Sequence, residues 1–234
     1  MNREEFIEEV KKLNIEVTDE KLELLEKFYN LLVEWNEKIN LTTIVEKDKV
    51  YLKHFYDSLT LTKEIDFTKD ITLCDVGSGA GFPGIVIKIF FPNVKITLID
   101  SLQKRVNYLN EVIKELNLKD INAEHFRMED YSRLHEEEFD YITARAVANI
   151  GIISEISVRA VKLNGHMVFM KANCDDELDI FLAYCQKLGL KLENTNEFQL
   201  PYEYSNRTLV NLVKTNHTNN LYPRRIDIIK KEYN

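Results

Sequence analysis

A glycine-rich segment that follows an apolar run is the part of the chain whose residue types and spacing point most directly to chemistry. Residues 73–84 read Leu-Cys-Asp-Val-Gly-Ser-Gly-Ala-Gly-Phe-Pro-Gly, and a second apolar run ends at Asp100. Glycine lets the backbone turn tightly and approach a bound cofactor closely, because it has no Cβ. A strand, a glycine loop and a helix, with an acidic residue about 20 positions further on, favour a nucleotide-cofactor site over a simple surface turn.

The glycine spacing indicates which kind of cofactor fits. A dinucleotide-binding loop has the pattern G-x-G-x-x-G and holds a pyrophosphate at a helix N-terminus. This chain instead has Asp-x-Gly-x-Gly-x-Gly, with Phe82 in place of the third glycine and the Asp75 carboxylate at the strand tip, where it would repel a pyrophosphate. The site suits a cationic cofactor, and S-adenosylmethionine (SAM) carries a sulfonium and an ammonium group. The pattern therefore favours a methyltransferase over a dehydrogenase.

The residues of this segment have distinct expected tasks. We expect Asp75 to orient the glycine loop or the SAM amino group. We expect Asp100, at the tip of the next strand, to accept hydrogen bonds from the ribose diol. The loop itself should contact the cofactor through Gly77, Gly79 and Gly81.

The elements that must position this site alternate between strand and helix. From Ile71 onward, short apolar runs alternate with helical patterns, as in the βαβ units of a largely parallel sheet. The patterns predict strands near 71–76, 95–100, 121–126, 139–144 and 165–171, and helices near 83–91, 103–117, 149–163 and 175–188. Two further strand-like runs, 190–200 and 207–214, suggest a closing antiparallel hairpin. We therefore predict an α/β fold of the class I SAM-dependent methyltransferase type, Rossmann-like, with a mostly parallel seven-stranded sheet whose last strand is antiparallel.

The first part of the chain is predicted to be a helical extension. After Thr18, a candidate N-cap, apolar residues recur at helical spacing from Leu22 to Ile39, and a second helical stretch covers roughly 47–61. We divide the chain into an N-terminal helical cap, residues 1–65, and a SAM-binding domain, residues 66–234, that ends in a basic tail.

Composition limits the class of protein. With 234 residues, the chain can bury one α/β core and a small helical appendage. Its three widely spaced cysteines form no C-x-x-C pair, so we expect reduced thiols, no metal site and a cytoplasmic location. No apolar run approaches the length of a membrane span. A net charge of −8 disfavours non-specific coating of nucleic acid. We expect a monomer.

Several short segments, in order along nearly the whole chain, together resemble one family: the bacterial small-subunit (16S) ribosomal RNA guanine-N7 methyltransferases, also called glucose-inhibited division protein B. The matching stretches are Trp35-Asn36, Asn40 to Thr42, His54 to Leu59, Asp75 to Gly84, Asp100-Ser101, Lys104-Arg105, Arg127 to Glu129, Thr143 to Ala146 and Tyr222 to Arg225. After Arg225 the chain departs from the Gly and Pro-rich ending of many relatives, which leaves the path of the tail open.

The resemblance implies a class I fold with a helical cap, and a reaction that methylates N7 of a guanine in the decoding region of 16S rRNA within the small ribosomal subunit. It implies SAM as the methyl donor. On the matching positions, Gly77 and Phe82 would contact SAM, Met128 and Glu129 would flank its adenine, and Arg145 would lie by the methionine end or the incoming base.

Guanine N7 carries a lone pair and no proton at neutral pH, so its methylation needs no general base. The protein contributes alignment and exclusion of water, which agrees with a sequence that shows no recognisable nucleophile and base pair. We expect Arg145 to donate to O6 or to a phosphate, or to stack on the base. The alternative is that Arg145 merely pairs with a carboxylate such as Asp75.

Other basic residues are candidate RNA contacts. Arg127 and Lys171 follow the third and fifth predicted strands, at the edge of the sheet where ligands bind, and we place them at the catalytic site as phosphate ligands; the alternative is a solvated charge at a strand end. Four more cations are candidate RNA-binding residues that would fix position on the RNA backbone: Lys104, Arg105, Arg224 and Arg225.

Two questions stay open at this point. His54, Asp57 and Ser58 share one helical face, and they could reach the cofactor or belong to the core. The function also has alternatives: a small-molecule SAM methyltransferase, which would not need the basic tail, or a non-catalytic ribosome-assembly factor that retains a SAM pocket.

Overall fold

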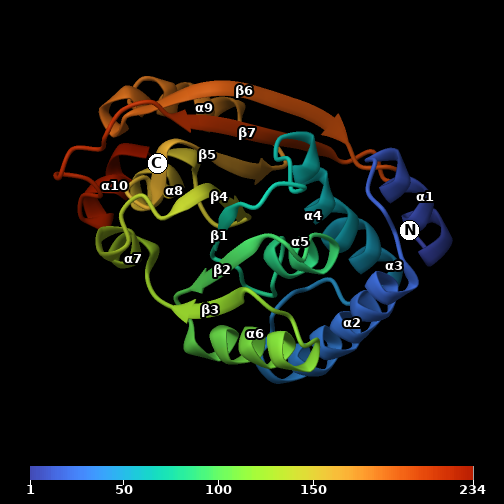
Figure 1. The fold of residues 1–234 in the computed structure, drawn as a ribbon. Coiled ribbons are helices and arrows are strands. Elements are labelled where there is room, and N and C mark those ends of the chain that lie inside the picture. Colours follow the sequence, from blue (N-terminus) through green and yellow to red (C-terminus); the bar gives the residue numbers. More distant parts are fainter. Residues whose placement is uncertain (234) are drawn as a thin grey trace.

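The apolar runs after Ile71 form one seven-stranded sheet in the computed structural model, which describes residues 1–233 (Figure 1). The strands are β1 (Thr72–Val76), β2 (Lys95–Asp100), β3 (Ile121–His125), β4 (Phe139–Arg145), β5 (Val161–Lys171), β6 (Leu190–Gln199) and β7 (Asn206–Lys214). Their order is β3-β2-β1-β4-β5-β7-β6, and the first five run parallel. Strand β7 is antiparallel to both β5 and β6. The predicted class I fold with an antiparallel last strand is confirmed.

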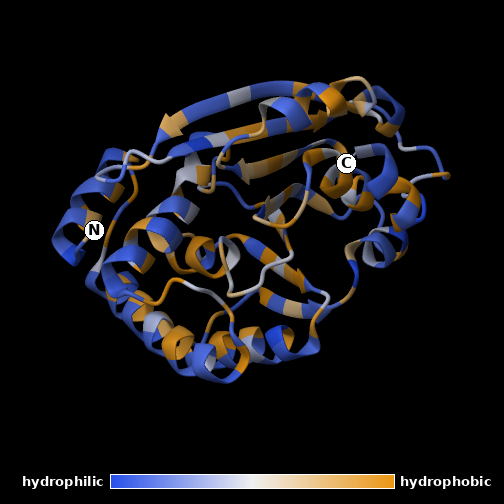
Figure 2. Cartoon of the chain, turned by 180° about the vertical axis from the view of Figure 1, so that it is seen from behind, coloured by the Kyte–Doolittle hydropathy of each residue, from blue (hydrophilic) through white to orange (hydrophobic). Residues whose placement is uncertain are grey.

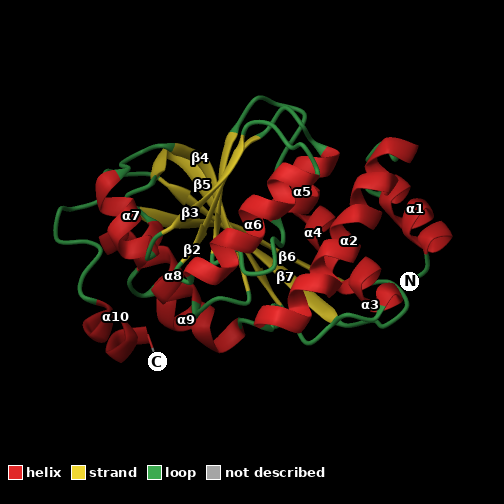
Figure 3. Cartoon of the chain, turned by 90° about the horizontal axis from the view of Figure 1, so that it is seen from below, coloured by secondary structure: helices red, strands yellow, loops and turns green. Residues whose placement is uncertain are grey.

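Helices cover both faces of this sheet (Figure 3). One face carries α5 (Gly84–Phe90), α6 (Gln103–Glu115) and the N-terminal helices, and the other carries α7 (Met128–Leu134), α8 (Ile150–Ser157), α9 (Asp175–Leu182), the short η3 (Cys185–Leu188) and α10 (Ile226–Tyr233). The buried apolar side chains form two clusters, one on each face. Hydrophobic residues dominate the central strands, whereas the edge strand β6 is mostly hydrophilic (Figure 2), as suits a strand exposed to water.

The N-terminal segment consists of α1 (Arg3–Lys12), α2 (Asp19–Ile39) and a second helical stretch composed of α3 (Lys47–Val50), η1 (Tyr51–Tyr56), α4 (Asp57–Leu59) and η2 (Thr60–Lys63). Thr18 is the N-cap of α2, as predicted, and its hydroxyl accepts a hydrogen bond from the Lys21 amide. Apolar residues of α2, such as Phe28, are fully buried in the same cluster as α5 and α6. The helical segment and the sheet therefore share one core.

Some boundaries differ from the predicted ones. The helix predicted over 149–163 ends at Ser157, because a turn follows and β5 already begins at Val161. Helices α7 and α10 are additional to the predicted elements, and each is short. No helix within residues 1–233 combines the length and apolar character needed to cross a bilayer.

Candidate functional site

The glycine loop lies at the carboxyl end of β1, where the central strands of the sheet end. Gly77, Gly79 and Gly81 all have positive φ, a conformation that residues with a Cβ adopt at a cost. A Cβ on Gly77 would also lie only 2.6 Å from a methyl group of Val147. The loop is fixed by hydrogen bonds from the Gly77 amide to the Ile99 carbonyl (2.7 Å) and from the Ser78 hydroxyl to the Asp75 carbonyl (2.8 Å). This close approach explains why glycine is required at this turn.

Asp75 is a fully buried carboxylate beneath the loop. Its Oδ2 accepts from the Gly84 amide at 2.9 Å, whereas its Oδ1 has no hydrogen-bond partner among residues 1–233. Burial raises the pKa of this carboxyl to about 7, although the Gly84 hydrogen bond and the nearby Arg145 oppose the shift. An unpartnered buried carboxylate oxygen is costly and suits a cationic ligand group.

Asp100 braces the loop from the neighbouring strand. Its Oδ2 accepts from the Gly79 amide at 3.0 Å and its Oδ1 from the Leu102 amide at 2.9 Å, and Arg105 lies 3.4 Å away. The carboxylate is almost fully buried by these contacts. The structure therefore gives Asp100 a positioning task, and the proposed ribose contact stays a prediction.

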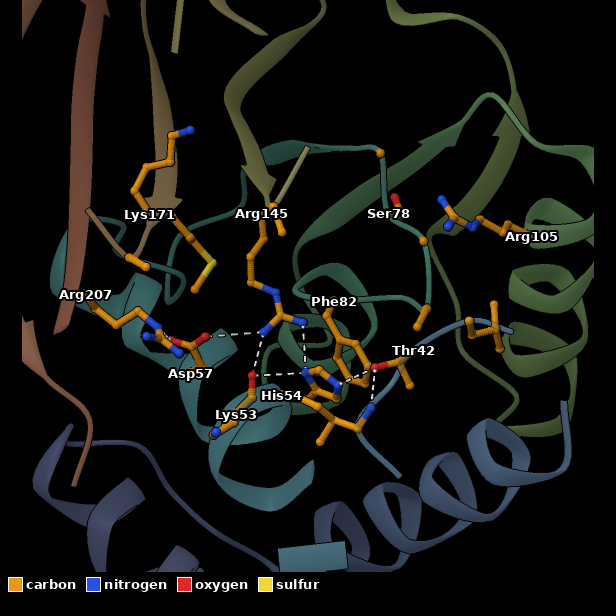
Figure 4. Close-up of a pocket in the computed structure, with 18 of the residues that line it drawn as sticks. Thr42, Lys53, His54, Asp57, Ser78, Phe82, Arg105, Arg145, Lys171 and Arg207 are labelled. Atoms are coloured by element: carbon orange, nitrogen blue, oxygen red, sulfur yellow. Dashed lines mark hydrogen bonds and ion pairs between the residues drawn. The ribbon is translucent and has the colours of Figure 1, made fainter. Parts of the chain in front are cut away.

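A cavity of about 560 Å³ opens between the glycine loop, the N-terminal helices and the ends of β4, β5 and β7 (Figure 4). Five cationic side chains line it: Lys53, Arg105, Arg145, Lys171 and Arg207. Of the described residues that line it, only Asp57 has a carboxylate. The cavity therefore attracts anionic groups, although the whole chain is acidic.

Arg145, at the end of β4, is held rigidly in this cavity. Its NH1 group donates to the Lys53 carbonyl (2.8 Å) and to Asp57 Oδ2 (3.3 Å), and its NH2 group lies 3.2 Å from His54 Nδ1. The guanidinium carbon lies 5.2 Å from the centre of the Phe82 ring. The alternative expected from the sequence, a pairing of Arg145 with a carboxylate, is found in the structure, but the partner is Asp57 and not Asp75.

His54 forms a layer under Arg145. Its ring stacks on Phe82 with 4.4 Å between centroids, and its Nε2 lies 3.2 Å from the Thr42 hydroxyl. Burial, reinforced by the positive charge of Arg145, lowers the pKa of His54 to about 3, so the ring is neutral. The same Nδ1 also lies 3.0 Å from the Lys53 carbonyl. It donates to that carbonyl when it carries the ring proton, and it accepts from Arg145 only in the tautomer with the proton on Nε2, because an arginine can only donate.

The segment that holds His54 is a π-helical turn, η1, a feature that is frequent at functional sites. The Thr42 that faces His54 is fixed in turn by Asn36, whose side chain accepts from the Thr42 amide at 2.8 Å. Ser58 is buried and donates to the His54 carbonyl, so its task is structural. His54 and Asp57 thus reach the site, whereas Ser58 supports the helix.

Arg207, at the start of β7, is a site residue that the sequence analysis did not identify. Its Nε donates to Asp57 Oδ1 at 3.0 Å and its NH1 to the Asn206 carbonyl at 2.8 Å. Because β7 is antiparallel to β5, its first residues lie beside the end of β5, where Thr208 pairs with Lys171. The predicted closing hairpin was the signal that could have identified Arg207, because an antiparallel strand begins at the edge of the sheet where its neighbour ends.

The other predicted cations fall into different settings. Lys171 lines the cavity and pairs with Glu177 at 2.8 Å, and Arg105 lines it beside Asp100. Arg127 is exposed and lies 4.0 Å from Glu129, whereas Lys104 is exposed on the first turn of α6. Their RNA contacts stay predictions.

The two tail arginines differ sharply. Arg224 donates through Nε and NH2 to Glu155, at 2.9 and 2.7 Å, and also pairs with Glu232. Glu155 is fully buried, so this cluster anchors the C-terminal segment to α8 and leaves Arg224 little capacity to bind RNA. Arg224 is therefore a structural residue and not a proposed RNA contact. Arg225 is exposed and pairs only with Asp227, at 3.2 Å.

A second cavity, of about 190 Å³, lies on the other side of Gly77, which lines both cavities. Apolar side chains from the β2, β4 and α8 regions line it, among them Ile99, Val147 and Ile152. Met128 and Glu129, the residues expected to flank the adenine of SAM, line it as well. Helix α10 closes one side through Ile226 and Lys230. Arg127 also lines this cavity. A mostly apolar slot with a few polar groups suits a purine ring.

The two cavities and Asp75 together test whether SAM fits. The apolar slot can take the adenine, and Gly77 lines both cavities. Asp75 lines neither cavity, and its unpartnered oxygen is buried beneath the glycine loop, so its contact with the ammonium group stays a prediction. The residues present therefore fit this cofactor. Among the side chains that the structure describes, no cluster of His, Cys, Asp and Glu could hold a metal ion.

Comparison with known proteins agrees with this geometry. The family model for rRNA small subunit methyltransferase G matches residues 21–210. "Ribosomal RNA small subunit methyltransferase G" of Lysinibacillus sphaericus is 43% identical over 234 residues, 99% of this chain and 98% of the relative. The protein of the same name from Bacillus velezensis is 45% identical over 96% of this chain and 95% of the relative. A crystal structure of a SAM-dependent methyltransferase from Aquifex aeolicus shares the fold, with a TM-score of 0.54 at 18% identity, over 72% of this chain and 94% of that one.

Proposed function

Because the chain belongs to the rRNA small subunit methyltransferase G family, we propose that it is a SAM-dependent methyltransferase that modifies N7 of one guanine in 16S rRNA. We further propose that the guanine lies in the decoding region and that the small ribosomal subunit, in the cytoplasm, is the substrate. The observation that carries this proposal is a cationic cavity, lined by Arg145 and Phe82, that lies beside an apolar slot, with Gly77 lining both.

The cofactor supplies an electrophilic methyl group at its sulfonium, and the in-plane lone pair of guanine N7 can attack it without prior deprotonation. The residues around the cavity agree with chemistry that needs no base. His54 is neutral and has both ring nitrogens engaged, and the Asp57 carboxylate is bound by two arginines. The protein therefore acts by positioning the guanine against the methyl donor and by excluding water.

Arg145 is the residue that we expect to hold the target nucleotide or the methionine end of the cofactor. It cannot contact N7 itself during the reaction, because positive charge develops on the purine as the methyl group arrives. Its contacts with Lys53, His54 and Asp57 fix the guanidinium before the substrate binds, which lowers the cost of ordering it later. We propose a role as donor to O6, to a phosphate or to a carboxylate.

The assembled subunit is the proposed substrate for an electrostatic reason. A chain of net charge −8 binds naked RNA weakly, because affinity for a nucleic acid backbone depends on neutralised phosphates. Five cations line the cavity, so we propose that the protein depends on an RNA loop that is already presented to this cavity in the correct shape. We propose that the protein acts as a monomer.

The test is methyl transfer from labelled SAM to unmodified small subunits, to protein-free 16S rRNA and to a panel of small metabolites. We expect transfer to the subunit, with much less to naked rRNA and none to metabolites. Arg145→Ala should lose activity by at least about tenfold, which matches the loss of one fixed donor. Arg3→Ala, at an exposed position at the start of α1 and outside the proposed site, is the control and should stay active. Labelled metabolites with untouched rRNA would instead support the small-molecule alternative, and a full biological effect without any transfer would support an assembly factor.

A further inference from the structure

We propose that Asp57 is a positioning residue that sets the two arginines of the cavity in place, an inference that rests on the proposed rRNA methylation. Asp57 comes from the N-terminal helices, and its side chain is only 4% exposed. One carboxylate oxygen accepts from Arg145 at 3.3 Å and the other from Arg207 at 3.0 Å (Figure 4). Asp57 thereby connects the N-terminal segment to arginines at the ends of β4 and β7.

The charge balance of the cavity singles out this trio. Each of the other cavity cations pairs with an acid of its own: Lys53 with Glu203, Arg105 with Asp100 and Lys171 with Glu177. Arg145 and Arg207 instead share the single charge of Asp57. The trio therefore keeps one net positive charge, which matches the single charge of one nucleotide phosphate, and the shared carboxylate holds two guanidiniums close together that would otherwise repel each other.

Arg207 occupies a position that suits a substrate strand entering the cavity. It lines the main cavity and also a neighbouring groove of about 320 Å³, where Phe198, Gln199 and Asn206 form part of the wall. Its guanidinium is fixed by Asp57 on one side and by the Asn206 carbonyl on the other. We therefore assign to Asp57 the task of aligning Arg145 at the reaction side and Arg207 at the boundary with this groove.

A purely structural task for Asp57 is the competing explanation, because the residue also ties the N-terminal segment to the sheet. The chain offers a matched control for this. Glu64 follows η2 and makes the same kind of tie, accepting from Asn196 at 3.0 Å and from Asn211 at 3.1 Å, but it does not line the cavity. Loss of either carboxylate removes a contact between the two parts, and only loss of Asp57 releases the arginines.

The experiment compares Asp57→Asn, Asp57→Glu and Glu64→Gln for thermal stability and for kcat and KM with unmodified small subunits. We expect Asp57→Asn to lower kcat by about 10- to 100-fold, the effect of misplaced groups, without raising KM, because the cavity becomes more positive. Glu64→Gln should lose about as much Tm as Asp57→Asn but keep a kcat within about twofold of the wild-type value. Asp57→Glu should recover part of the kcat that Asp57→Asn loses. Equal kcat values for Asp57→Asn and Glu64→Gln would overturn the inference.

A double-mutant cycle gives an independent outcome. If Asp57 acts through both arginines, the variant Asp57→Asn/Arg207→Ala should lose less rate than the two single losses multiplied together, because only the part of the Asp57 effect that passes through Arg145 remains. Additive losses would show that Asp57 does not act through that arginine and would contradict the assignment. A wild-type protein that transfers no methyl group to the subunit would instead refute the proposed function, so the two failures are distinguishable.

Discussion

Replacement of Asp75 by asparagine should stabilise the protein without cofactor and weaken the binding of SAM. Burial raises the pKa of the Asp75 carboxyl to about 7, from an ordinary value of 3.8. The folded chain therefore keeps a proton that the unfolded chain has lost between about pH 4 and pH 7. Because the folded state binds more protons in that window, its stability falls as the pH rises through it.

The size of this effect follows from the shift. A difference of about 3 pKa units at about 1.4 kcal/mol each corresponds to at most about 4 kcal/mol of lost stability at pH 8. Asparagine cannot ionise, and its side-chain oxygen can still accept from the Gly84 amide as Asp75 does at 2.9 Å. We therefore expect Asp75→Asn to match the wild type near pH 4 and to exceed it at pH 8, by up to about 8–16 °C in Tm for a chain of this size.

The assay is thermal unfolding of both proteins from pH 4 to pH 8, with Asp70→Asn, at an exposed position, as the control. In parallel, SAM affinity should fall at least about tenfold in Asp75→Asn, because the buried oxygen that faces no partner loses its charge. A stability difference that does not change with pH, or an Asp75→Asn variant less stable than the wild type at pH 8, would refute this reasoning.

Two further predictions concern the glycine loop and the C-terminal segment. Gly77→Ala should weaken SAM binding at least about tenfold more than Gly79→Ala. Both glycines have positive φ, but a Cβ on Gly77 would lie 2.6 Å from Val147, whereas a Cβ on Gly79 would meet nothing nearer than a carbonyl oxygen at 3.7 Å. Equal SAM affinities of the two variants in equilibrium binding would contradict this. Glu155→Ala should destabilise the fold by about 3–5 kcal/mol, because it leaves the partly buried Arg224 without its main partner; an unchanged denaturant midpoint would exclude that role.

The sequence was sufficient for the order of elements and for the cofactor loop. The apolar runs bounded by turn residues predicted the strands and the βαβ units. The acidic residues at the tips of β1 and β2, together with the glycines, predicted the cofactor loop. The family resemblance predicted which residues surround the cofactor. Boundaries were less accurate, since the helix predicted to end at residue 163 stops at Ser157. Helices α7 and α10 have only 7 and 8 residues, and neither was predicted.

The partners inside the site could not be predicted from spacing. Asp57 bonds to Arg145 across 88 positions and to Arg207 across 150, and no local pattern relates residues so far apart. The helical spacing of His54 and Asp57 placed both on one face but left open what that face contacts. The same applies to Arg224, which looks like a basic tail residue in the sequence but is bound by the buried Glu155, 69 positions away.

The most direct test of the central claim is to map the methyl group within 16S rRNA after reaction of the wild-type protein with unmodified small subunits and labelled SAM. Chain cleavage at N7-methylguanine should give one cut, at a single guanine of the decoding region, and the amount of cleavage should rise with the amount of label transferred. Label at another atom or another nucleotide, or subunits that stay unlabelled while the protein binds SAM, would contradict the account.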